Sequence, residues 1–486
     1  MRLFIFSCSV LLLLAGPVLA GVSETEYYAV LMEGHKIGHA VHVRDVQSGK
    51  VTTTEQVNMV IGRGDISMAV STVETCIETT DGKPIGFAYT QDLSGMSQKM
   101  TGKINEQGKL EVAIMGAGMS QQQTIDWPKG AVMAEGMRLL ELKKGLAEGV
   151  TYEAAIFSPA LLSAVEAKVH VGPTANIDLF GRVPALTEVN VSMLMQGTTF
   201  TSVSYVDKDF RAQKTIMPTM GMNLELIACD KAFALSDNDV VDFLEKLLVQ
   251  SPVALEDVRS AKSITYHFVP TGGTKLSIPS TDNQTVQQTK EGSVIVTVRP
   301  AQAAAGVKFP YKGSEAGVLE ALKPAQYLQS DNKEVMALAR KAVGGTKDAA
   351  QAVHKIGNFV NEYISEKNLS IGYASAVEVA GSRQGDCTEH AVLTAAMCRA
   401  VGIPARVVCG LVYVEDFDGR KNVFGGHAWA EAYVGGKWIG LDATRAPNGF
   451  GAGHITMAAG NGDPADFFSM ASTLGYFKIE KVTMEK

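Results

Sequence analysis

A single cysteine at a loop-to-helix junction constrains this chain more than any other feature. Cys387 follows a polar run over 381–384 and precedes an apolar helical pattern that continues to Ala400. A cysteine at such a junction sits at or near a helix N-terminus, where backbone N–H groups without an intrahelical partner carry partial positive charge. That charge favours the thiolate over the thiol and can also hold an oxyanion. The junction therefore predicts a nucleophilic cysteine.

A predicted hairpin further along the chain supplies a histidine and an acid. A strand-like run begins at His427, Gly-Gly at 435–436 marks a two-residue turn, and a return run covers 437–444. Pairing across this turn places Trp429 opposite Asp442, so His427 lies on the same sheet face as Asp442, one diagonal step away. Diagonal neighbours lie ~7–8 Å apart at the backbone, within reach of a side-chain hydrogen bond.

Cys387, His427 and Asp442 are the three candidate catalytic residues. In this interpretation the cysteine attacks, the histidine takes the thiol proton and later donates it to a leaving amine, and the aspartate fixes the imidazole tautomer. Each residue also has an ordinary explanation. A lone buried cysteine is usually a small core hydrophobe, and a lone polar residue in a hairpin is usually at the surface. The three residues together, in this order, favour catalysis.

These motifs resemble the transglutaminase-like superfamily, most closely its bacterial members. The resemblance covers about residues 325–447 and rests on Gly-Asp-Cys-Thr-Glu-His-Ala at 385–391, Ala-Val-Gly-Ile-Pro-Ala-Arg-Val-Val at 400–408, Gly-His-Ala-Trp-Ala-Glu at 426–431 and Trp-Ile-Gly-Leu-Asp-Ala-Thr at 438–444. It implies a papain-like α+β core with a triad at Cys387, His427 and Asp442. Known members include protein cross-linkers, cysteine peptidases, peptide N-glycanases and inactive domains. The resemblance thus implies thiol chemistry and leaves the substrate open.

The first twenty residues have the pattern of a secretory signal peptide. A basic start, Met1-Arg2, precedes an apolar run over 3–14, and small residues end the segment at Ala20. The alternative is a membrane anchor, but the apolar run is shorter than the ~20 residues that a membrane-spanning helix needs. We therefore expect cleavage after Ala20, a periplasmic or secreted protein, and no stable membrane span afterwards.

The remaining chain indicates an α+β protein of several parts. Period-two patterns dominate the first half and predict a large antiparallel sheet, curved or partly closed, whereas two amphipathic helices over 331–343 and 348–364 precede the cysteine. We expect a signal peptide at 1–20, a β-rich N-terminal domain at 21–250, a small β unit at 255–300, the transglutaminase-like catalytic domain at 317–450, and a C-terminal loop and final strand at 451–486, the loop covering 451–470.

Composition narrows the possible partners. The net charge of −7 argues against a nucleic-acid binder. The sequence has no Gly-rich phosphate loop, no Cys-x-x-Cys and no His-x-x-x-His, so neither a cofactor nor a metal is expected. His35, His39 and His42 cluster on a strand-like run and are expected at its surface. The expected partner is a protein or peptide substrate.

The cysteine count predicts a free thiol. Of the six cysteines, five remain after removal of the leader, and an odd number outside the cytoplasm leaves at least one unpaired. Cys387 and Cys398 lie on one predicted helix, ~16 Å apart at 1.5 Å per residue, so they cannot bridge each other. A bridge between Cys398 and Cys409, or between Cys76 and Cys229, remains open.

Three functions remain open from the sequence. The first is a thiol acyl-transfer enzyme that acts on amide bonds, the second a binding or assembly protein with a vestigial triad, and the third a non-catalytic redox thiol protein. The complete triad disfavours the second, and the lack of a nearby resolving cysteine disfavours the third. Within the first, hydrolysis is favoured over cross-linking, because water is always available as the acceptor unless the cleft excludes it.

Overall fold

The structure is a computed structural model. It describes residues 23–63, 66–94, 96–116, 119–195, 198–241, 248–271, 275–367, 374–446, 449–463, 470 and 473–486. The predicted signal peptide at 1–20 lies outside these residues. The chain divides into two compact units, one holding the described residues up to 241 and the other those from 248 onward. Each unit is described by itself.

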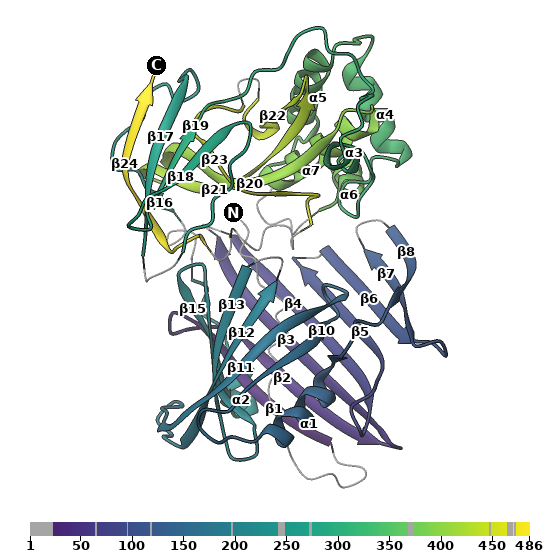
Figure 1. The fold of residues 1–486 in the computed structure, drawn as a ribbon, viewed down its shortest axis with the longest axis vertical. Coiled ribbons are helices and arrows are strands. Elements are labelled where there is room, and N and C mark those ends of the chain that lie inside the picture. Colours follow the sequence, from purple (N-terminus) through teal and green to yellow (C-terminus); the bar gives the residue numbers. More distant parts are fainter. Residues whose placement is uncertain are drawn as a thin grey trace. The chain divides into compact units, whose positions relative to one another are not determined.

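The first unit is built around one 15-stranded sheet, which confirms the predicted large antiparallel sheet (Figure 1). Its strands follow the order β8-β7-β6-β5-β4-β3-β2-β1-β15-β14-β13-β12-β11-β10-β9, antiparallel except that β9 pairs in parallel with β10. Its elements are β1 (Ser23–Met32), β2 (His35–Gln47), β3 (Lys50–Arg63), β4 (Ile66–Thr79), β5 (Pro84–Leu93), β6 (Met96–Ile104), β7 (Lys109–Gly116), β8 (Met119–Asp126), β9 (Ala131–Val132), α1 (Ala134–Lys144), β10 (Thr151–Ser158), β11 (Ser163–Asn176), β12 (Ala185–Met195), β13 (Thr198–Val206), β14 (Ala212–Thr219), β15 (Met222–Cys229) and α2 (Lys231–Ala234).

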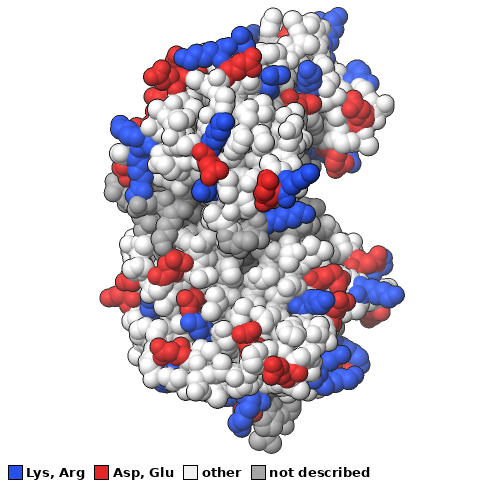
Figure 2. Space-filling view, turned by 60° about the vertical axis from the view of Figure 1, so that its left-hand side comes forward, with Lys and Arg blue, Asp and Glu red and all other residues white. Residues whose placement is uncertain are grey.

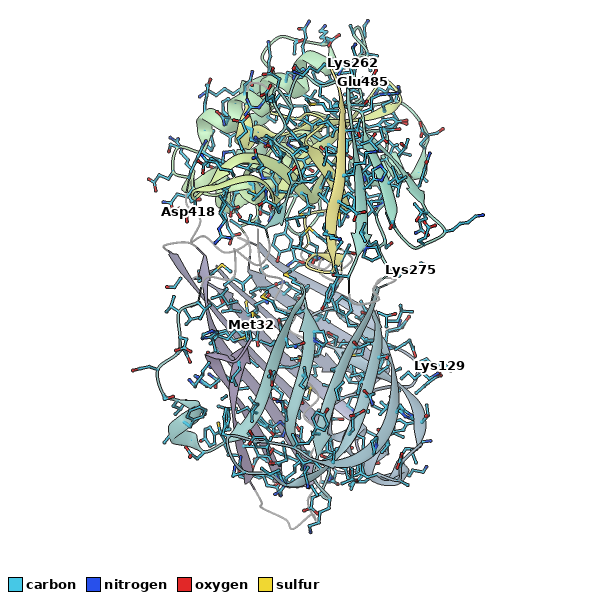
Figure 3. All side chains as sticks on the ribbon, turned by 90° about the vertical axis from the view of Figure 1, so that its left-hand side faces the viewer. Met32, Lys129, Lys262, Lys275, Asp418 and Glu485 are labelled. Carbon is cyan, nitrogen blue, oxygen red and sulfur yellow. The ribbon has the colours of Figure 1, made fainter. Side chains whose placement is uncertain are left out.

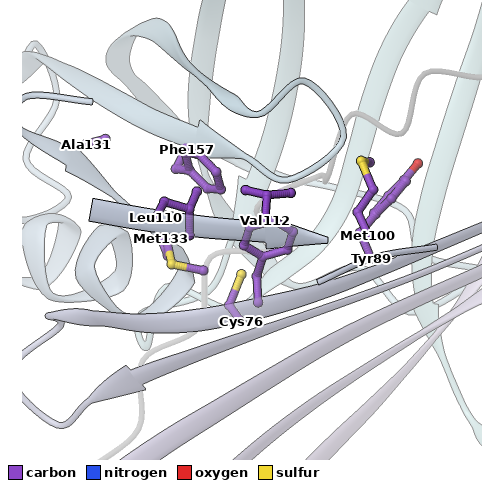
Figure 4. Packing of buried hydrophobic residues seen from close by; sticks show 9 residues of the cluster. Cys76, Tyr89, Met100, Leu110, Val112, Ala131, Met133 and Phe157 are labelled. Atoms are coloured by element: carbon purple, nitrogen blue, oxygen red, sulfur yellow. The ribbon is translucent and has the colours of Figure 1, made fainter. Parts of the chain in front are cut away.

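This sheet curves so that strands far apart in its order share a core. Phe87 of β5 and Phe157 of β10 lie with ring centroids 5.5 Å apart. They belong to one buried cluster with Cys76, Tyr89, Met100, Leu110, Val112, Ala131 and Met133 (Figure 4). Burying apolar side chains on the inner face of a curved sheet allows it to form a core without a second layer.

The inner face of this sheet also buries charged groups. His42 is buried and paired with Glu55, so the prediction that this histidine lies at the surface is wrong. Side chains of its strand alternate between two faces as expected. However, the face that carries His42 is the inner face of the curved sheet, where neighbouring strands cover it. Arg44 donates to Glu135 at the start of α1, at 2.9 Å. Buried charges require such partners, because an unpaired ion loses its hydration without compensation.

The second unit combines two sheets and the helices that precede and carry the cysteine. One sheet has the order β16-β21-β20-β23 with β22 paired to β21, and the other has the order β18-β19-β17-β24. Its elements are β16 (Val249–Gln250), β17 (Ser263–Pro270), β18 (Gln284–Gln288), β19 (Val294–Val298), α3 (Ala316–Glu320), α4 (Lys333–Val343), α5 (Ala349–Tyr363), α6 (Ala376–Ser382), α7 (Cys387–Ala400), β20 (Ala405–Phe417), β21 (Arg420–Val434), β22 (Lys437–Leu441), the 3₁₀ turn η2 (Ala443–Arg445), β23 (His454–Gly460) and β24 (Phe477–Glu485). The α+β class is therefore confirmed.

The hairpin of β21 and β22 has the predicted register. Val434 pairs with Lys437 across a turn made by Gly435 and Gly436. Both glycines have positive φ, 65° and 87°, as a two-residue turn matching the strand twist requires. The two helices predicted before the cysteine are also present as α4 and α5.

The C-terminal segment differs from the prediction in one part. The predicted loop over 451–470 contains β23, which pairs with β20, so that part of the prediction is wrong. The first five residues of β23 are all buried, and a strand buried on both faces has no alternating pattern. The final strand is present as β24. It pairs with β17, and the Lys262 N–H donates to the Glu485 carbonyl at 2.9 Å beside its end (Figure 3).

The surface carries charges of both signs. On the face drawn in Figure 2, Lys and Arg side chains are interspersed with Asp and Glu. Among the described helices, none is long and apolar enough to cross a membrane.

We expect a fragment of residues 243–486 to fold on its own, whereas a fragment that begins at Gly317 should not. The shorter fragment lacks β17, which pairs with β24, and lacks Asn283, which donates to the fully buried Glu431 at 2.8 Å. Circular dichroism and urea unfolding of both fragments and of the full chain test this. A cooperative transition of the shorter fragment at the midpoint of the longer one would contradict the expectation.

Candidate active site

The local sequence fixes Cys387 as the first residue of α7. Asp386 is the N-cap, and its Oδ1 accepts the Thr388 N–H at 2.9 Å. Glu389 reaches back to accept the Asp386 N–H at 3.0 Å, which completes a capping box. Gly385 has φ of 151°, and a Cβ there would meet the Glu389 side chain at 2.2 Å. Gly385, Asp386 and Glu389 therefore each have a geometric role in starting the helix at the cysteine.

The structure brings the three predicted site residues together. His427 on β21 lies with Nε2 2.9 Å from Oδ2 of Asp442, the residue that follows β22. The His427 imidazole also lies close enough to the Cys387 thiol to lower the pKa of that thiol. Because Nε2 is engaged with the carboxylate, Nδ1 is the ring nitrogen left for the sulfur. The three side chains thus lie next to one another in the order thiol, imidazole, carboxylate.

Charges within this group of three side chains shift the pKa values of Cys387, His427 and Asp442. Burial and Asp386 raise the pKa of Cys387, but the charge and hydrogen bond of His427 outweigh them and lower it to about 7. Burial lowers the pKa of His427, but Asp442 and the thiolate raise it to about 10. Burial also opposes ionisation of Asp442, yet the two neighbouring imidazoles hold its pKa well below the usual range. Between about pH 7 and 10 the thiolate–imidazolium pair is therefore the dominant form.

Sequence reasoning missed a second histidine at this site. His454, the first residue of β23, places Nε2 3.0 Å from the same Oδ2 of Asp442. It was missed because its segment was predicted to be a loop. The one available signal was a histidine followed by a run over 455–459 that is apolar except for Thr456.

The same side chains have ligand atoms close enough for a cation. The nitrogens of His427 and His454 and a carboxylate oxygen of Asp442 lie within 4.8 Å of one another. However, both Nε2 atoms lie at hydrogen-bond distance from one oxygen, 2.9 and 3.0 Å. Hydrogen bonding therefore accounts for this grouping without a metal.

The other four cysteines of the described chain differ from Cys387. None of the five is in a disulfide, so neither bridge left open by the sequence forms. Cys76, Cys398 and Cys409 are buried, and burial raises the pKa of Cys398 to about 12. Burial also raises the pKa of the half-buried Cys229. Cys387 alone is both partly exposed and shifted toward the thiolate.

Comparisons with known proteins agree with the family resemblance. Residues 336–443, which include all three candidate residues, match the transglutaminase-like superfamily. Similar solved structures include a candidate cysteine protease from Cytophaga hutchinsonii (21% identity, 49% of this chain and 91% of that chain, TM-score 0.31). A second is a β-barrel-like protein from Brucella abortus (13% identity, 44% of this chain and 98% of that chain, TM-score 0.33). A third is the periplasmic domain of TgpA from Pseudomonas aeruginosa, bound to ethylmercury (18% identity, 40% of this chain and 88% of that chain, TM-score 0.26). No curated protein matches the chain.

Alkylation of Cys387 by iodoacetamide should increase with pH along a curve with its inflection near 7, the value to which the pKa of this thiol is lowered. Above that pH the thiolate predominates, whereas Cys398 stays protonated and buried. Peptide mass spectrometry over a pH series measures both rates in one sample. His427→Ala should move the Cys387 inflection upward. Equal labelling of all five thiols would contradict the assignment.

Asp442→Asn should retain the fold and lower turnover by orders of magnitude, ~10⁴-fold by analogy with a serine triad. The amide has the shape of the carboxylate but not its charge, so it no longer stabilises the His427 imidazolium. Hydrolysis of p-nitrophenyl acetate gives the turnover, and the urea midpoint controls for folding. A loss of less than tenfold would mean that another group orients the imidazole.

Proposed function

We propose that this chain, whose residues 336–443 form a transglutaminase-like domain, is an exported thiol enzyme that acts on amide bonds of proteins or peptides through Cys387, His427 and Asp442. The observation that carries the proposal is the grouping of three side chains: the His427 imidazole lies beside the partly exposed Cys387 and lowers the pKa of its thiol, and its Nε2 lies 2.9 Å from the Asp442 carboxylate. A thiol protein without catalysis has no need for a buried carboxylate behind the imidazole.

Acylation begins with the thiolate–imidazolium pair. The Cys387 sulfur attacks the substrate carbonyl, and the carbonyl π electrons move onto the oxygen. The Cys387 N–H belongs to the first turn of α7, where backbone donors have no intrahelical partner, so it is placed to donate to that oxyanion. His427 then gives its proton to the leaving nitrogen, the C–N bond breaks, and a thioester and a free amine result.

Deacylation uses the same imidazole as a base. Neutral His427 takes a proton from water, the oxygen attacks the thioester carbonyl, and the C–S bond breaks to regenerate the Cys387 thiolate and release an acid. If an amine attacks instead, the product is a new amide. Because Cys387 is partly exposed and water is always available as an acceptor, we favour hydrolysis over cross-linking.

Export rests on the leader sequence alone. The basic start, apolar run and small residues at the end of 1–20 are those of a cleaved secretory signal. The proposed location is therefore the periplasm or the extracellular space.

Incubation of the full chain with a fluorescent primary amine and a glutamine-containing protein tests the reaction class. We expect ammonia release or new peptide termini, with little fluorescence in the protein band, and loss of all products in Cys387→Ala. Cys229→Ala is the matched control, because that thiol lies on β15 in the other unit. Dominant incorporation of the amine would favour cross-linking. Absence of every product together with an unreactive Cys387 would support the vestigial alternative.

A further inference from the structure

We propose that His454 is a positioning residue, which acts through Asp442 as a second, neutral hydrogen-bond donor to the carboxylate that orients His427. The inference rests on the proposed function, because it assigns a role in the same reaction. It extends the predicted Cys-His-Asp series by one member that lies on a different strand of the sheet.

The contact with Asp442 requires a hydrogen on Nε2 of His454. A carboxylate only accepts, so the Nε2 atom that lies 3.0 Å from Asp442 Oδ2 must carry the hydrogen. Nδ1 lies 3.2 Å from both the N–H and the carbonyl oxygen of Gly451, and in a neutral ring it accepts from the N–H. The ring is buried, and burial lowers the pKa of His454. His454 therefore donates to Asp442 without bringing a second positive charge.

The surrounding rings hold this imidazole in place. Its centroid lies 4.7 Å from that of Phe450 and 5.2 Å from that of Trp429, which meets it edge-on at 82°. The His427 ring lies 6.0 Å away, so the two imidazoles reach Asp442 without stacking on each other. Because the ring is packed on several sides, its N–H has a fixed position and can hold the carboxylate that accepts from it in one orientation.

The donation restricts Asp442 to one orientation. Oδ1 accepts the Thr444 N–H at 3.1 Å, and Oδ2 accepts from both histidines. Without His454, Oδ2 is held only by the imidazole that it is meant to orient, and the buried carboxylate loses one of its three donors. His427 must change protonation state twice in each turnover, whereas His454 stays neutral throughout. We therefore assign to His454 the hydrogen bond that holds Asp442 in the same orientation throughout the turnover.

Two amide substitutions separate the donor role from packing. His454→Gln can place an N–H near the position of Nε2, whereas His454→Asn reaches only the position of Nδ1. His454→Phe keeps the ring and removes both nitrogens. With the full chain and p-nitrophenyl acetate as the probe, we expect kcat to fall ~10–100-fold in the Phe and Asn variants with little change in KM, by analogy with outer partners of ligating histidines. His454→Gln should recover most of the loss.

The controls distinguish this inference from the proposed function. If Cys387→Ala hydrolyses the ester as fast as the unmodified chain, the proposed function fails. If Cys387 is required but His454→Phe turns over within threefold of the unmodified chain, or His454→Gln is no faster than His454→Asn, the positioning role is wrong. Urea midpoints identify a variant that fails to fold. Should His454→Phe do so, the comparison of the two amide variants still decides the question.

Discussion

The buried carboxylate of Asp442 is the constraint on which the site depends. Its side chain is fully buried, and a carboxylate in such a place must be compensated by donors or become protonated. The donors come from three elements: β21, β23 and η2, with the Thr444 N–H from the last. These elements meet only when the sheet of β16, β21, β20 and β23 is assembled. An ionised Asp442 and a basic His427 are therefore consequences of the tertiary fold rather than of any local motif.

The two cysteines of α7 show how much the surroundings decide thiol chemistry. Cys387 begins the helix beside an imidazolium, and its pKa is lowered to about 7. Cys398 is buried in the last turn of the same helix, and burial raises its pKa to about 12. Burial opposes ionisation at both positions. Only at the N-terminus do the neighbouring cation and its hydrogen bond exceed that cost, so a cysteine in this helix is a nucleophile only at its start.

Local rules predicted part of this site and long-range pairing determined the rest. The Gly-Gly turn and the two-residue period of a strand were sufficient to place His427 beside Asp442, and the observed register agrees. His454 could not be placed in this way, because β23 is buried on both faces and pairs with a strand more than forty residues earlier. His42 was misjudged for a related reason: alternation identifies the two faces of a strand but not which of them a curved sheet encloses.

Two glycines also shape the site, because a side chain at either position would clash with its neighbours. A Cβ on Gly449 would lie 2.0 Å from the Asp442 carbonyl oxygen, and a Cβ on Gly440 would lie 2.3 Å from the Phe450 ring. Both glycines therefore allow the segment around Phe450 to lie directly against β22 and the residue that follows it. That approach places the Phe450 ring against His454. Glycine in a strand usually costs stability, but here it permits the close packing that positions the second donor of Asp442.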